Sequence, residues 1–125
     1  MPYRSRQTIA TLVDGLEKLD PDMQVFVEGP ENPENPDGVS SWRGDYSELQ
    51  IERGGEKPWT VGELLTELRA AIGKEFEGYK GGHYMMYNDT RVWIDTYGSS
   101  NCIAAAEVVP HGSDAVLIRG FYTGY

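Results

Sequence analysis

The chain has few of the residues that disulfide-stabilised proteins, metalloproteins and membrane proteins depend on. Its one cysteine, Cys102, excludes a disulfide within the chain and suits a reducing cytoplasm. Its two histidines, His83 and His111, have no second ligand or nucleophile at a useful spacing. No apolar run approaches the roughly 18 residues that a membrane span requires. The sequence therefore predicts neither an enzyme nor a metal, cofactor or membrane-spanning protein.

The chain also lacks a signal-peptide pattern. Basic residues occur in the segment 1–6, but an amphipathic helix follows them instead of an apolar stretch. We expect the whole chain to be the mature protein, located in the cytoplasm. Its 125 residues fit one domain, residues 1–125, that is large enough to bury a core without disulfides.

Basic residues are scarce, and the net charge is −9. Such a charge repels nucleic acid and anionic lipid and favours a basic protein partner. Between residues 20 and 37 there are six acids and no Lys or Arg, which is typical either of a solvated loop or of a surface that docks on a basic protein. The candidate binding residues in this segment are Glu28, Glu31, Glu34 and Asp37.

Two segments have the apolar periodicity of amphipathic helices. The first, residues 8–19, begins at the candidate N-cap Thr8 and ends before Pro21. The second begins at Thr60, which forms a Thr-x-x-Glu capping box with Glu63, and extends to residue 73 or 76. The apolar faces are Ile9, Leu12, Val13, Leu16 and Leu19 in the first and Val61, Leu64, Leu65, Leu68 and Ala71 in the second.

The remaining pattern is mostly that of strands. Alternating or apolar runs predict strands at 23–29, 46–52, 83–87, 91–97, 102–109 and 115–119. Proline, asparagine and glutamate predict an exposed loop over 29–41, and glycine predicts another over 77–82. The sequence therefore predicts an α+β fold, with two amphipathic helices on one face of a mostly antiparallel sheet of five to six strands.

The two helical segments each lead to a strand with similar text. The segment Asp22–Val27 resembles Asp89–Ile94, and the two helices share the same apolar offsets. One interpretation is an internal duplication of a helix-strand unit. The other is that both segments converged on one amphipathic pattern.

A second set of candidate binding residues lies in loops and strands rich in aromatic and glycine residues. The glycines of 78–82 allow backbone N–H groups to converge on an anion, with Lys80 as a point charge and Tyr79 as a stacking ring. Arg43, Trp93 and Tyr97 are of the types that dominate binding hot spots. These residues suggest either a protein interface or a pocket for a nucleotide-type ligand.

Five motifs in order resemble a group of small proteins encoded by bacteriophages and prophages. The resemblance covers about residues 42–98 and rests on Trp42–Leu49, Thr60–Leu65, Phe76–Gly82, Thr90–Ile94 and Tyr97–Gly98. It implies a phage origin and a host bacterial cytoplasm, and it transfers no catalytic or binding residue to this chain.

Three hypotheses follow. The first is a non-enzymatic phage protein that binds and antagonises a host protein with a basic surface, such as a CRISPR effector or another defence complex. The second is a protein that binds or sequesters a small nucleotide-type ligand through Gly78–Gly82. The third is a phage protein of structural or unknown role. The last strand and the aromatic tail after it are candidates for contacts in a homodimer.

Overall fold

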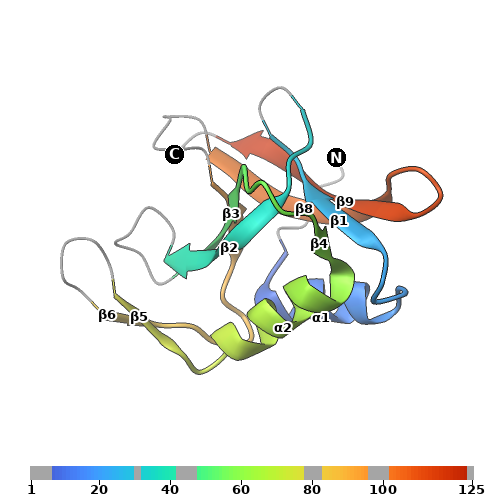
Figure 1. Ribbon diagram of the computed structural model, residues 1–125. Helices are drawn as coiled ribbons and strands as arrows, with labels where there is room; N and C mark the ends of the chain where they lie inside the picture. The colour runs from blue at the N-terminus through green and yellow to red at the C-terminus, as the bar shows by residue number, and fades with distance from the viewer. Residues whose placement is uncertain (1–6, 30–31, 42–47, 78–82, 96–101, 124–125) are drawn as a thin grey trace, which may run out of the picture.

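The computed structural model describes residues 7–29, 32–41, 48–77, 83–95 and 102–123, with backbone alone at 102, 104, 106 and 121–123. Two helices and nine strands occur in this part of the chain (Figure 1). In chain order they are α1 (Ile9–Glu17), β1 (Gln24–Val27), β2 (Pro36–Ser41), β3 (Leu49–Arg53), β4 (Trp59–Thr60), α2 (Val61–Ala71), β5 (Glu75–Glu77), β6 (His83–Met85), β7 (Val92–Ile94), β8 (Cys102–Pro110) and β9 (Ala115–Thr123).

Seven strands form a mixed sheet in the order β2-β3-β7-β8-β9-β1-β4, and β5 pairs with β6 in a separate hairpin. The pairs β1–β9 and β3–β7 are parallel and the others are antiparallel. The predicted α+β class is confirmed, but the strands outnumber the prediction. In Figure 1 both helices lie side by side below the strands, and the β5–β6 hairpin extends from the end of α2.

Three segments differ from their predicted structure. The loop predicted over 29–41 contains β2, because Pro36 lies at the first residue of an outer strand, where a missing N–H is tolerated. The chain after α2 forms β5 instead of a longer helix, since positive φ at Gly73 (79°) ends the helix. The tail beyond residue 119 continues β9, because its backbone pairs with β8 as far as Thr123.

Both helices begin with the same capping geometry. The Thr8 and Thr60 hydroxyls accept hydrogen bonds from the N–H groups of Thr11 and Glu63, at 3.2 and 3.1 Å. The side chains of Thr11 and Glu63 in turn accept from the N–H groups of the two caps. An ion pair of 2.6 Å between Glu17 and Arg69 joins the helices to each other.

Each helix also begins against a strand of the other half of the chain: α1 against the start of β7, and α2 against the start of β1. The first two N–H groups of each helix donate to carbonyls just before that strand, over 2.8 to 3.0 Å: Ile9 to Thr90, Ala10 to Asn88, Val61 to Met23 and Gly62 to Pro21. The residue before each helix also forms an antiparallel bridge with a residue at the start of that strand. Thr8 pairs with Arg91, and Thr60 pairs with Gln24. The two halves of the chain therefore exchange their helix starts reciprocally.

The two parallel strand pairs repeat the same reciprocity in register. Val25 pairs with Val116, and Val92 pairs with Leu49. Val25 and Val92 are 67 positions apart, and so are Leu49 and Val116. The matched pairs are Val25–Val116, Phe26–Leu117 and Val27–Ile118 in β1–β9, and Val92–Leu49, Trp93–Gln50 and Ile94–Ile51 in β7–β3. This agreement favours internal duplication over convergence. The equivalent units are α1-β1-β2-β3 and α2-β7-β8-β9, and the β5–β6 hairpin lies between α2 and β7 of the second unit.

The hairpins that end the two units also correspond. The β2–β3 pairing shifts register between Pro36 and Gly38, and the β8–β9 pairing shifts between Ala105 and Glu107, at the equivalent place. The bridge between Ile94 and Ile103 has its counterpart in the bridge between Val27 and Glu34. Through this last bridge the sheet curls until the segment before β2 meets β1, so six strands form a ring.

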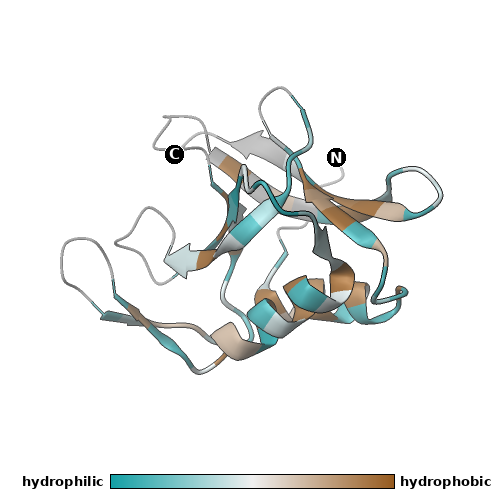
Figure 2. Ribbon diagram, in the orientation of Figure 1, coloured by the Kyte–Doolittle hydropathy of each residue, from teal (hydrophilic) through white to brown (hydrophobic). Residues whose placement is uncertain are grey.

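The buried residues of both units form one hydrophobic cluster. Both helix stripes and the inward residues of the ring contribute, and equivalent positions are buried in both units: Leu12 and Leu64, Leu16 and Leu68, Val25 and Val92, Leu49 and Val116, Ile51 and Ile118. Figure 2 shows apolar residues on both helices and on β1 and β9. In the described part of the chain, no helix is both long and apolar enough to cross a membrane.

Candidate functional site

The acidic segment predicted to bind a basic partner is partly neutralised within the fold. Glu34 forms an ion pair with Arg53, whose side chain is only 4% exposed. Glu28 accepts a hydrogen bond of 3.1 Å from the N–H of Gly120, and the Arg119 guanidinium lies 4.0 Å from it. No basic residue is near these acids in the sequence, because their partners Arg53 and Arg119 lie on β3 and β9, which approach them only in the fold. Glu28 and Glu34 are therefore half-buried structural groups as well as candidate binding residues.

Asp37 is exposed and occupies the register shift of β2. Its carboxylate contributes to the environment of the neighbouring Glu52. Burial raises the pKa of Glu52, a hydrogen bond from Ser40 opposes this, and the charges of Asp95 and Asp37 raise the pKa further. The Ser40 hydroxyl lies 3.3 Å from the Glu52 carboxylate. This edge of the sheet therefore concentrates negative charge.

The aromatic candidate Trp93 was expected on the surface, and this expectation is wrong. Its side chain is 2% exposed, because both faces of β7 are buried between neighbouring strands and the core. Its indole N–H donates a hydrogen bond of 2.6 Å to Glu48. Trp93 therefore positions a carboxylate instead of contacting a partner. The other candidates lie outside the described residues: Glu31, Arg43, Tyr79, Lys80 and Tyr97, with the glycine loop 78–82.

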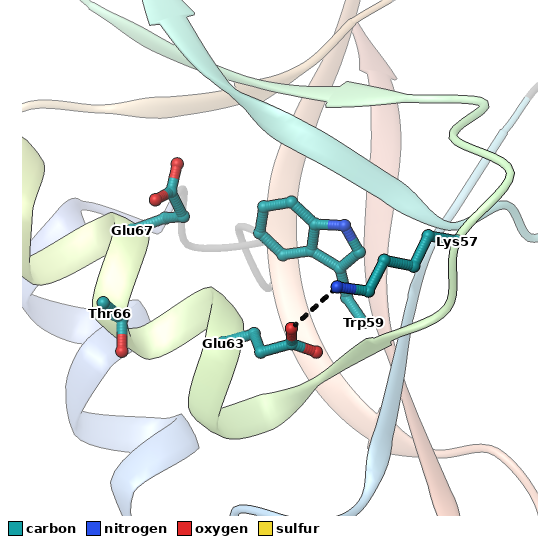
Figure 3. A pocket seen from close by; sticks show the side chains of 5 residues that line it. All are labelled: Lys57, Trp59, Glu63, Thr66 and Glu67. Carbon is teal, nitrogen blue, oxygen red and sulfur yellow. Dashed lines mark ion pairs between the residues drawn. The ribbon is translucent and has the colours of Figure 1, made fainter.

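A hollow of about 380 Å³ lies where β4 leads into α2 (Figure 3). Trp59 is half-buried, and its ring also packs against the core cluster. In Figure 3 the indole lies between the side chains of Glu67 and Lys57, and Glu63 extends below it. The lining residues are Lys57, Trp59, Glu63, Thr66 and Glu67.

The electrostatics of the hollow are set by the helix start. Glu63 accepts from the backbone N–H of Thr60 at 2.9 Å, and this bond is the main reason that its pKa is lowered. Lys57 lowers the pKa further, with its ammonium 3.6 Å from the carboxylate. Glu63 therefore stays ionised, and Glu67 lies one turn further along the same helix.

An indole flanked by carboxylates is suited to a cation. The face of an aromatic ring attracts an ammonium or guanidinium group, and nearby carboxylates add charge complementarity. The chain's own Lys57 places an ammonium beside one of these carboxylates, 3.6 Å from Glu63. The hollow was missed at the level of sequence, because Trp59 was not among the predicted binding residues. The signal was present in Trp59, which lies in β4 just before α2, and in Glu63 and Glu67, which lie one turn apart on that helix.

A second hollow, of about 570 Å³, lies at the base of the β5–β6 hairpin. It is lined by Glu48, Met85, Tyr87, Asp89, Thr90 and Arg91. Met85 and Tyr87 are 39% and 57% exposed, and they are the exposed large apolar side chains of the described chain. Thr90 is buried, and its hydroxyl accepts a hydrogen bond of 2.7 Å from the N–H of Tyr87. The carboxylate that Trp93 holds forms part of its wall.

Other reactive groups of the described chain are dispersed. No three His, Cys, Asp or Glu residues within the described ranges lie close enough to hold a metal ion. His83 lies 3.0 Å from Glu75 on the hairpin, and the ring of His111 contacts that of Phe26 edge to face, with centroids 5.2 Å apart.

The chain matches no protein-family model, no curated protein and no solved structure.

Proposed function

We propose that this chain is a non-enzymatic binding protein that docks on a basic surface of another protein. The observation that carries the proposal is the Trp59 hollow, in which an indole lies beside the carboxylates of Glu63 and Glu67. A lysine or arginine of the partner would displace Lys57 and stack on the ring. The net charge of −9 supports the same class of partner, because it accelerates the approach of a basic surface.

The finer part of the proposal concerns the biological setting. The resemblance to phage and prophage proteins favours a partner in the host bacterial cytoplasm, and binding would antagonise that partner. A defence complex with a nucleic-acid channel, such as a CRISPR effector, offers the basic surface that an acidic protein can occupy. The same negative charge disfavours direct binding to nucleic acid.

A titration of the isotopically labelled protein with a hexa-arginine peptide tests the hollow. We expect shifts of the Trp59 indole N–H and of the amides of 63–67, and we expect affinity to fall as salt screens exposed charges. The double variant Trp59→Ala/Glu67→Gln should weaken binding about tenfold, in line with the loss of one aromatic anchor. Asp14→Asn, which removes an exposed carboxylate from α1, serves as the matched control.

Capture from host lysate then links the hollow to a natural partner. The wild-type chain should retain a basic protein at low salt, and the double variant should lose it while Asp14→Asn keeps it. Equal capture by all three chains would contradict docking through Trp59. Capture that persists unchanged at high salt would contradict a charge-driven contact.

A further inference from the structure

We infer that the outward face of the β5–β6 hairpin, with the hollow at its base, binds an extended segment of a protein partner in which basic and apolar residues alternate. The inference rests on the proposed function for the charge of the partner. It places this contact away from Trp59, on the part of the molecule where the two units differ most.

The hairpin is an insertion in the second unit. Thr8 and Thr60 are 52 positions apart, whereas the equivalent strands β1 and β7 are 67 positions apart, so the second unit has 15 additional residues between its helix and β7. In the first unit the equivalents of Ala71 and Asn88 are Leu19 and Pro21, and Asp20 alone lies between them. The first unit thus makes the same helix-to-strand connection without a hairpin.

The two faces of the hairpin are different. Tyr84 and Phe76 are half-buried against the core cluster, and Met86, which follows β6, is fully buried. Met85 is exposed on the outward face, and exposed Tyr87 follows at the base. A fold that has no structural need for these apolar side chains exposes both of them on the same insertion, which is typical of a contact surface.

The backbone of the hairpin favours an extended partner. Among the described strands β6 pairs with β5 alone, in the register Glu75–Met85, Phe76–Tyr84 and Glu77–His83. The other edge of β6 can therefore accept a further strand by main-chain hydrogen bonding. The adjoining hollow of about 570 Å³ can receive an apolar side chain between Met85 and Tyr87.

The charge of this surface selects the partner. The carboxylates of Glu75, Glu77, Glu48 and Asp89 outnumber the cations of Arg91 and Lys74. The Lys74 ammonium lies over the Phe76 ring, 5.0 Å from its centroid, and His83 lies 3.0 Å from Glu75. Basic side chains of an added segment would meet these carboxylates. A second copy of this chain carries the same net charge of −9 and would bring the same carboxylates close together, so electrostatic repulsion disfavours it as the partner.

Fluorescence anisotropy with a labelled nine-residue peptide that alternates lysine with valine tests the inference. The wild-type chain should bind this peptide, and the same peptide with glutamate for lysine should bind at least tenfold more weakly. The double variant Met85→Ser/Tyr87→Ser should lose at least tenfold in affinity, because it removes the apolar side chains of the proposed contact. Both side chains are exposed, so the fold should be retained. Asp14→Asn, which removes an exposed carboxylate from α1, should bind this peptide normally.

Deletion of residues 72–86 provides a second variant, since it recreates the short connection of the first unit. It should abolish peptide binding. The far-ultraviolet circular dichroism spectrum of this variant should keep the features of both helices. Loss of peptide binding in Trp59→Ala, with full binding in Met85→Ser/Tyr87→Ser, would overturn the inference and leave the proposed function intact. Absence of binding to both this peptide and hexa-arginine would overturn both. A dimer that Met85→Ser/Tyr87→Ser disrupts would assign the face to a second copy and also overturn the inference.

Discussion

In the second unit, a glycine and an isoleucine occupy the positions equivalent to Arg53 and Glu34. By strand register their counterparts are Gly120 and Ile103. Arg53 also donates a hydrogen bond of 2.5 Å from Nε to the carbonyl of Asp95. The first unit thus contains a nearly buried ion pair where the second unit is hydrophobic. Such a pair stabilises little relative to an apolar pair, but it is costly to break.

Removal of one member of this pair should therefore be severe. Arg53→Met should lower the free energy of unfolding by about 3 kcal/mol, because it leaves the Glu34 carboxylate without its partner. The double variant Glu34→Leu/Arg53→Met should be more stable than Arg53→Met alone, since no charge is left uncompensated. Urea denaturation followed by circular dichroism measures both. A double variant less stable than the single variant would contradict this account.

Glu52 should make stability depend on pH. Burial raises its pKa above the ordinary value of 4.5, so the folded chain binds this proton more tightly than the unfolded chain. The penalty for the ionised group is therefore present at pH 7 and is relieved as pH falls through the raised pKa. We expect Glu52→Gln to be more stable than the wild type at pH 7, with an advantage that shrinks toward pH 4.5.

Urea denaturation of both proteins across this pH range measures the difference. Glu77→Gln, a change to an exposed glutamate, controls for the loss of one negative charge. A difference between Glu52→Gln and the wild type that stays constant with pH would contradict the assigned cause.

At the scale of elements, the two helix starts are equivalent and should respond equally to mutation. Thr8→Ala and Thr60→Ala each remove the hydroxyl that accepts from the third helical N–H, so each should lower the free energy of unfolding by about 1 kcal/mol. Thr8→Ser and Thr60→Ser keep the acceptor and should be nearly neutral. Urea denaturation of the four variants provides the measurement, and a neutral Thr60→Ala would contradict the equivalence.

The helices could be predicted because their signals are local. A capping residue and a stripe of apolar side chains lie within one segment of sequence, and the structure places both helices within two residues of the predicted ends apart from the extension beyond Gly73. β2 and β5 were missed for a related reason. β2 begins at a proline, and β5 is three residues long, so neither displays a clear alternation.

At the scale of the whole molecule, the strand partners could not be read from the sequence. β1 pairs in parallel with β9, and β3 with β7, through side-by-side backbones that leave no local pattern. The same limit applied to the candidate site. Trp93 looked like a surface aromatic because its strand alternates, and Glu34 looked unpaired because Arg53 lies on a different strand. The similarity of the two helix-strand segments was the one long-range signal in the sequence.

The exchange of helix starts constrains the order in which the molecule can be made. During synthesis α1 leaves the ribosome long before Thr90 and Asn88, the residues whose carbonyls accept its first N–H groups. α2 finds its receiving carbonyls at Met23 and Pro21 already emerged. The first N–H groups of α1 therefore gain their partners only after most of the polypeptide has been synthesised, and the second half of the chain completes the hydrogen bonds of the first.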